Sequence, residues 1–194
     1  MSGRQVHSGT FWNPWRLGGW GLALGLLLLP AIAMQFTGEV QWTLGDFLVA
    51  AMMLAILGLG IELTVRVTRN SLYRAGAAVA LLSGFLVIWI NGAVGIIGNE
   101  DHPANLMFFG VIALAIAGSF ICRFRARGMA RNMAMTGLAQ LTAPLIAIAI
   151  WSLPVTVDLV KTLIFNAGLA GFWLASAWLF RQAAESGEPL INVN

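Results

Sequence analysis

The chain has 194 residues, of which 59% are hydrophobic and 10% are charged, and its mean hydropathy is +0.82. A soluble domain carries roughly 25% charged residues. A chain with so few charges cannot cover its surface in water, so a lipid bilayer is its expected solvent. The net charge of +3 does not indicate nucleic-acid binding, because the arginines form short clusters between apolar runs rather than a basic face.

Six apolar stretches are long enough to cross a bilayer, since a spanning helix needs about 20 mostly apolar residues. The stretches are continuously apolar, which predicts helices rather than the alternating strands of a barrel. Short connections favour one compact bundle. The sequence therefore predicts an all-α polytopic membrane protein, a single domain over residues 1–194. Its six spans are expected at about residues 17–36, 44–65, 73–97, 103–122, 132–151 and 155–180.

The basic residues are distributed unevenly over the connections. Every arginine falls before the first span, after the second, after the fourth or after the sixth. The only lysine, Lys161, falls on the opposite side together with five acids: Glu39, Asp46, Glu100, Asp101 and Asp158. Because basic connections stay in the cytoplasm, this bias predicts cytoplasmic N- and C-termini and an acidic periplasmic or extracellular side.

The first span has an alternative interpretation as a cleaved signal peptide. It combines basic residues, the run LALGLLLL and small residues near Ala31 and Ala33. The region before the apolar run is long, however, and Pro30, Met34 and Phe36 continue that run. We therefore expect a retained span, and the other five keep the same orientation in either case.

Two charged residues at the cytoplasmic end of the second span and two asparagines inside the third and sixth spans are candidates for a role within the membrane. Glu62 and Arg66 are four residues apart, with the acid first, which is the favourable order for a helical ion pair; a cytoplasmic gate is the alternative. Asn91 and Asn166 carry amides that usually bond across to another helix. We interpret both asparagines as helix-packing residues, with a place along a transport path as the alternative.

Pro144 falls in the middle of the fifth span, after Gln140 and Thr142. Proline removes one backbone hydrogen bond, and in membranes neighbouring side chains or water satisfy the freed group. The sequence leaves open whether this kink faces a polar cavity or is only structural.

An arginine cluster follows the fourth span. Its first role is topological, as the signal that keeps a connection in the cytoplasm. Such a cluster also suits anionic lipid headgroups. We expect these headgroups at Arg123, Arg125, Arg127 and Arg131.

The stretch 91–105 covers the end of the third predicted span, the connection and the start of the fourth span, and it is polar in an otherwise apolar chain. A helix-to-helix turn accounts for Gly98, Asn99 and Pro103. It does not require two further acids and a histidine, which could bind a cation or relay a proton. With two acids expected on the same side, the candidate outer polar cluster is Glu39, Asp46, Glu100, Asp101, His102 and Asn105.

No cofactor is expected. Cys122 is the only cysteine, which excludes an intrachain disulfide and metal sites built on paired cysteines. The two histidines, His7 and His102, are expected on opposite sides of the membrane.

Three runs resemble a family of small uncharacterised bacterial multi-pass membrane proteins. They are PAIAMQFTGEVQWTLGDF (30–47), GLGIELTVR (58–66) and NGAVGIIGNEDHPANLMFFG (91–110). The resemblance covers about the first two thirds of the chain and implies a bacterial inner-membrane protein. It implies no activity.

Three functions remain open. The first is a small transporter or channel-like protein for protons, cations or a small solute. The second is a noncatalytic accessory or scaffold subunit that binds another membrane protein or a second copy. The third is a membrane-embedded enzyme with Asp101 and His102 as an acid–base pair; it is the weakest, because the sequence has no nucleophile–base spacing, metal-ligand set or nucleotide loop. Convergence of the polar residues on one cavity would favour transport, and outward-pointing residues with an open Gly/Ala face would favour the scaffold.

Overall fold

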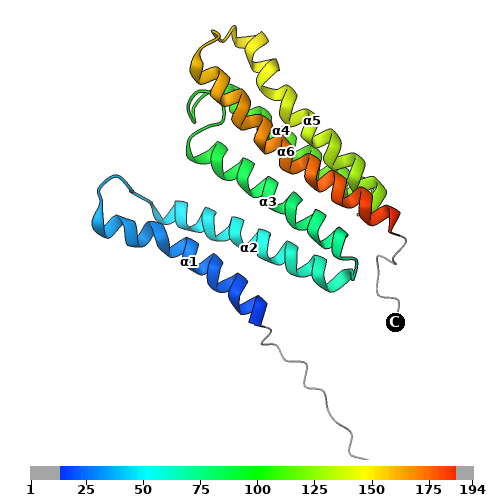
Figure 1. The fold of residues 1–194 in the computed structure, drawn as a ribbon. Helices are drawn as coiled ribbons and strands as arrows, with labels where there is room; N and C mark the ends of the chain where they lie inside the picture. Colours follow the sequence, from blue (N-terminus) through cyan, green and yellow to red (C-terminus); the bar gives the residue numbers. More distant parts are fainter. Residues whose placement is uncertain (1–13, 187–194) are drawn as a thin grey trace, which may run out of the picture. The chain divides into compact units, whose positions relative to one another are not determined.

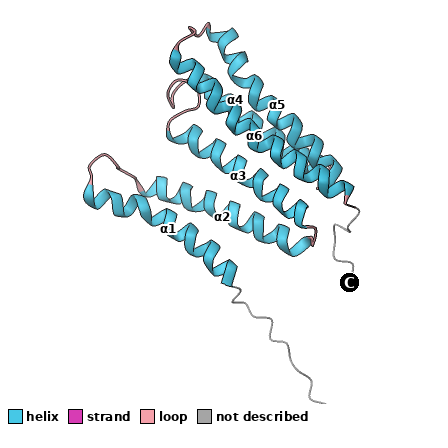
Figure 2. Cartoon of the chain, in the orientation of Figure 1, coloured by secondary structure: helices cyan, strands magenta, loops and turns pink. Residues whose placement is uncertain are grey.

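The computed structural model describes residues 14–186, and every regular element in that range is helical (Figures 1 and 2). Six long helices are each long and apolar enough to cross a membrane. This confirms the predicted all-α fold with six transmembrane helices. The elements are α1 (Pro14–Phe36), α2 (Leu44–Val67), α3 (Ser71–Ala93), the short 3-10 helix η1 (Pro103–Asn105), α4 (Leu106–Ile121), α5 (Ala126–Trp151) and α6 (Val157–Glu185).

The end of α3 differs from the prediction. The helix ends at Ala93 rather than near Ile97, and Gly95 (φ +72°) then takes a left-handed conformation. Gly98, which the sequence assigns to the turn, is also left-handed (φ +70°) but lies farther along the connection. The sequence stays apolar past the end of the helix because the side chains of Ile96 and Ile97 are buried in the core. Hydropathy alone therefore overestimates the length of α3.

Helices α5 and α6 extend beyond their predicted spans. Helix α5 begins at Ala126 rather than Asn132, and α6 runs from Val157 to Glu185 rather than from 155 to 180. The added turns carry Arg127, Arg131 and Arg181. Long basic side chains reach water from within a helix end, so charged residues there do not interrupt the helix.

The packing divides the chain into two units, each described by itself: unit 1 up to Gly58 and unit 2 from Leu59, with the boundary inside α2. In unit 1, α2 starts with a capping box. The Asp46 carboxylate accepts the backbone N–H of Thr43 (2.7 Å), and the Thr43 hydroxyl accepts the N–H of Asp46 (3.3 Å). Farther along α2, Gly58 packs closely against the Trp20 indole of α1.

In unit 2, α6 packs against both α3 and α5, and α4 packs against α5 (Figure 1). One part of the core centres on the large buried side chains of Met133, Trp173 and Phe180. A second part centres on Val87 and Phe108. Four helices therefore enclose an interior with two apolar clusters, in which buried polar side chains also lie.

The two ends of unit 2 differ in charge. We call the end with the α2–α3 and α4–α5 connections the basic end; there the Tyr73 hydroxyl donates to the Phe124 carbonyl (2.7 Å) and the Asn70 amide donates to Ser186 Oγ (2.9 Å). The acidic end carries the α3–α4 and α5–α6 connections. Every arginine of unit 2 lies at or near the basic end: Arg66, Arg69, Arg74, Arg123, Arg125, Arg127, Arg131 and Arg181.

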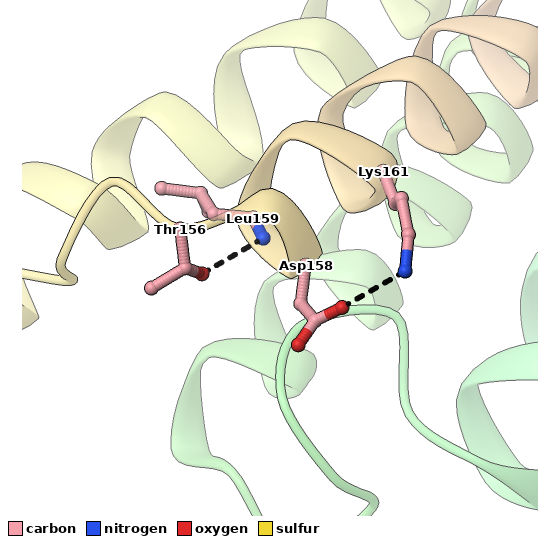
Figure 3. Close-up of polar contacts among 4 residues, drawn as sticks. All are labelled: Thr156, Asp158, Leu159 and Lys161. Carbon is pink, nitrogen blue, oxygen red and sulfur yellow. Dashed lines mark hydrogen bonds and ion pairs between the residues drawn. The ribbon is translucent and has the colours of Figure 1, made fainter.

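The α5–α6 connection at the acidic end leads into a capped helix start (Figure 3). The Thr156 hydroxyl accepts the backbone N–H of Leu159 (3.2 Å), which satisfies one of the free N–H groups of the first turn of α6. Asp158 and Lys161 form an ion pair (3.2 Å) with both side chains largely in the open. An exposed pair of this kind adds little to stability.

Candidate functional site

Asn105 organises the connection between α3 and α4. Its side-chain oxygen accepts the backbone N–H groups of Ile96 (3.0 Å) and Ile97 (2.9 Å). Its side-chain nitrogen donates to the carbonyls of Ile97 (3.2 Å) and Asn99 (2.6 Å). The residue is 3% exposed, so the amide predicted for the outer polar cluster is occupied by the backbone of its own connection.

Asn91 joins the last turn of α3 to this connection. Its side-chain nitrogen donates to the backbone carbonyl of Asn105 (3.1 Å). Its side-chain oxygen is buried and has no hydrogen-bond partner among residues 14–186. Asn91 and Asn105 therefore form one clamp between α3 and the start of α4.

His102 caps η1. Its Nδ1 accepts the backbone N–H of Ala104 (3.2 Å), and Pro103 occupies the first turn of η1. The imidazole also meets the Trp151 ring at the end of α5 edge-on, with 5.6 Å between ring centroids. His102 thus connects the α3–α4 connection to the end of α5.

Two acids of the predicted outer cluster lie in the same connection as Asn105 and His102, and the other two lie in unit 1. Glu100 and Asp101 are exposed. Glu39, also exposed, belongs to unit 1, as does Asp46, which is part of the capping box. Within residues 14–186, no three His, Cys, Asp or Glu side chains come together as a metal site. His7 lies outside the described residues.

At the middle of α5, Asn166 of α6 compensates for Pro144. A proline leaves the carbonyl four residues earlier without its helical N–H partner, and here that carbonyl belongs to Gln140. The Asn166 side chain donates to it (2.8 Å), and the Gln140 side chain donates in return to Asn166 Oδ1 (2.9 Å). Both residues are fully buried, so the proline and its partners lock α5 to α6.

Asn132 links α5 to α4. Its side chain donates to the Ala115 carbonyl (2.8 Å) and to Ser119 Oγ (3.2 Å). Gly118 makes this approach possible, because a Cβ there would lie 1.9 Å from Asn132 Oδ1. The sequence analysis did not single out Asn132, although a polar amide inside an apolar helix and a glycine on the preceding helix were visible signals.

Ser176 completes the set by donating from α6 to the Gly76 carbonyl of α3 (2.8 Å). Each neighbouring helix pair of unit 2 is therefore joined by a buried hydrogen bond between a side chain and a backbone carbonyl. We call these bonds the hydrogen-bond circuit. Its members are Asn91 to Asn105, Asn132 to Ala115, Asn166 to Gln140, and Ser176 to Gly76.

Three buried polar atoms of unit 2 have no partner among the described residues: Asn91 Oδ1, Gln140 Oε1 and Trp173 Nε1. The buried polar residues of the described chain are all uncharged Thr, Asn, Ser and Gln side chains. The interior therefore offers hydrogen-bond donors and acceptors from neutral groups.

Two features with charged residues lie near the basic end, an ion pair on α2 and the α4–α5 connection. Glu62 and Arg66 form the predicted ion pair, with 14% of the Glu62 side chain and 63% of the Arg66 side chain exposed. In the α4–α5 connection, Arg123 (φ +51°) and Phe124 (φ +56°) are both left-handed, and the Phe124 carbonyl accepts the Tyr73 hydroxyl. The four predicted lipid-binding arginines are exposed and form no ion pair with a described acid: Arg123, Arg125, Arg127 and Arg131.

The outward face of α6 carries small residues. Gly168 and Gly171 are exposed, and a Cβ added to either would meet nothing within 4 Å. Ala175 follows four residues later and is also exposed, which places the three residues on one side of the helix. Trp178 extends the same face, with 59% of its surface exposed.

The fold and the buried polar contacts define a multi-pass transmembrane protein. In comparisons with known proteins, no family model, no curated protein and no solved structure matches the chain.

Proposed function

We propose that the protein is a noncatalytic accessory or scaffold subunit of the bacterial inner membrane that binds another membrane protein. One observation carries this proposal. The buried amides and hydroxyls of unit 2 hold its own helices together, whereas α6 presents an open face of small residues: Gly168, Gly171 and Ala175.

The chemistry of helix association in lipid supports this role. Lipid tails are as apolar as leucine, so helices associate through close packing and hydrogen bonds, and small residues allow the backbones to approach. The hydrogen-bond circuit makes unit 2 a well-fixed platform. A second helix could therefore dock on Gly168 and Gly171 without rearrangement of α6.

The charge distribution supports an orientation with the basic end in the cytoplasm and both termini on that side. The acidic end would then face the periplasm. In this orientation the exposed arginines of the α4–α5 connection meet the anionic cytoplasmic leaflet. We therefore include anionic lipid headgroups among the partners of Arg123, Arg125, Arg127 and Arg131.

Site-specific photocrosslinking tests the scaffold proposal. A benzophenone side chain placed at Ala175 in living cells should give one reproducible adduct with a membrane protein, identified by mass spectrometry. The same probe at Leu138, an exposed residue of α5 (61%), should not give that adduct. The same adduct from both positions, or none from Ala175, would contradict the proposal.

A matched pair of glycine substitutions sharpens this test. A Cβ added at Gly171 meets nothing within 4 Å, so Gly171→Leu should not lower the melting temperature but should abolish the Ala175 adduct. Gly110→Leu on α4, where a Cβ also meets nothing within 4 Å, should leave the adduct intact. A partner that is a second copy would appear as an adduct of twice the mass.

A second candidate is the small transporter or channel-like protein for protons, cations or a small solute. The observation that favours it is the pair of buried, unpartnered carbonyl oxygens on Asn91 and Gln140, which could contact a solute inside unit 2. Reconstitution into liposomes separates the two candidates. A transporter should accelerate proton, cation or osmolyte flux over empty liposomes, and the scaffold should not.

A further inference from the structure

The imidazole of His102 makes contacts with its own connection and with α5. Its Nδ1 accepts the backbone N–H of Ala104 (3.2 Å), which caps η1. The ring meets the Trp151 ring edge-on, with 5.6 Å between centroids. Gly98 lies close to the same ring, because a Cβ there would be 3.4 Å from His102 Cδ2. The position of this one ring therefore affects both the connection and the end of α5.

The cap on Ala104 requires one protonation state of the ring. Nδ1 accepts a hydrogen bond only in the neutral imidazole, since in the charged form both ring nitrogens carry hydrogens and only donate. Histidine is the side chain whose charge ordinarily changes between about pH 5 and 8. Protonation places a hydrogen on Nδ1 against the Ala104 N–H, so the cap is lost.

The charged groups of the acidic end offer the protonated ring a different partner. Glu100 and Asp101 precede His102 in the same connection, are exposed, and form no ion pair with a described residue. At the start of α6, Asp158 and Lys161 pair with each other. The last turn of α5 and η1 carry no charged residue. The carboxylates beside the ring are therefore the partners that a charged imidazole can reach.

We propose that His102 is a pH-sensitive switch in the α3–α4 connection. Neutral His102 caps η1 and contacts Trp151. Protonated His102 gives up the cap and pairs with Glu100 and Asp101, which changes its contact with Trp151. The backbone of the connection stays in place, because the Asn105 amide that holds it does not titrate. In the proposed orientation, the switch transmits the pH of the periplasmic side to the end of α5.

Amide hydrogen exchange of the full chain in detergent micelles, measured by nuclear magnetic resonance, tests the switch. After correction for the intrinsic effect of pH on exchange, the protection of the Ala104 amide should fall about 2- to 30-fold from about pH 8 to about pH 5, as expected for the loss of one cap. The Ile97 amide, which is held by Asn105, is the internal control and should keep its protection. Constant protection at Ala104, or an equal fall at Ile97, would overturn the proposal.

His102→Asn is the matched variant. Asparagine is a favoured capping residue and does not titrate, so the Ala104 amide should be equally protected at both pH values. The same pH-dependent fall in this variant would assign the effect to another group and overturn the proposal. If the variant does not fold, the comparison of Ala104 with Ile97 in the wild type decides.

The acidic partners are tested by combining Glu100→Gln with Asp101→Asn. Both changes keep the size of the side chain and remove its charge, so the protonated imidazole loses its partners and the midpoint of the Ala104 change should move to lower pH. Asp158→Asn removes a carboxylate that already pairs with Lys161; as the control, it should leave the midpoint unchanged. An unmoved midpoint in the double variant, or an equal shift in the control, would contradict the pairing.

Discussion

The two connections that flank α4 both reverse the chain, but they satisfy the backbone by different means. The α3–α4 connection uses left-handed glycines and a buried amide, Asn105, which bonds to four backbone groups. The α4–α5 connection is short and places two residues with side chains, Arg123 and Phe124, in the left-handed region. There Tyr73 holds the Phe124 carbonyl from α3.

The difference shows how location decides which residues a turn can use. Ile96 and Ile97 of the first connection are buried in the core, so their N–H groups need a protein partner, and Asn105 supplies it. In the second connection the left-handed residues are exposed, so their side chains can extend away from the bundle. The strain of a left-handed backbone remains, at about 1–2 kcal/mol per residue.

The largest effect is expected from Asn105→Ala. The change removes four hydrogen bonds and leaves the buried N–H groups of Ile96 and Ile97 without an acceptor, which should lower the free energy of unfolding by about 2–5 kcal/mol. Denaturant titration in mixed micelles measures it. Asn99→Ala, an exposed position in the same connection, is the control and should change stability by less than about 0.5 kcal/mol. Equal effects would refute the role given to Asn105.

An intermediate loss is expected from Gly95→Ala. The new Cβ would sit at φ +72° and 2.5 Å from the Asn99 carbonyl oxygen, so we expect a loss of about 2–4 kcal/mol from strain and overpacking. Gly92→Ala, three residues earlier and facing open space, should be neutral or slightly stabilising. Melting temperatures of the two variants compare them directly, and similar values would argue against the described loop conformation.

The smallest effect, with the opposite sign, is expected from Arg123→Gly. Glycine tolerates φ +51° without steric cost, so the variant should be more stable by about 0.5–1 kcal/mol. Arg131→Gly removes the same charge from a helical position of α5 and should be less stable by up to about 1 kcal/mol. The same titration measures both, and a destabilised Arg123→Gly would show that the side chain itself holds the connection.

The six helices could be predicted from the sequence because each membrane span needs a long apolar stretch. Such a stretch is formed by consecutive residues, so it can be recognised without knowing which other parts of the chain it contacts. The sequence also predicted the helical pair of Glu62 and Arg66, whose spacing alone sets their contact. The predicted end of α3 was wrong because Ile96 and Ile97 are apolar for a different reason: they belong to the connection, and their side chains are buried in the core.

The contacts of the polar residues could not be predicted, because they depend on positions far apart in the sequence. The sequence grouped Asn105 with Glu100 and Asp101 as neighbours in one polar stretch. In the fold, Asn105 turns inward while the two acids stay exposed. Likewise, Pro144 indicated a freed carbonyl, but only the approach of α6 reveals Asn166 as its partner. Whether Glu100 and Asp101 bind a cation stays a prediction.

The pairing of Pro144 with Asn166 has a consequence for how the protein enters the membrane. The Gln140 carbonyl acquires its hydrogen bond from a helix that is synthesised later. Until α6 arrives, α5 would expose an unpaired carbonyl to hydrocarbon, which is costly. We therefore expect the last two helices to leave the insertion machinery together, as a hairpin, so that ribosomal synthesis of α6 sets the moment at which α5 becomes stable in lipid.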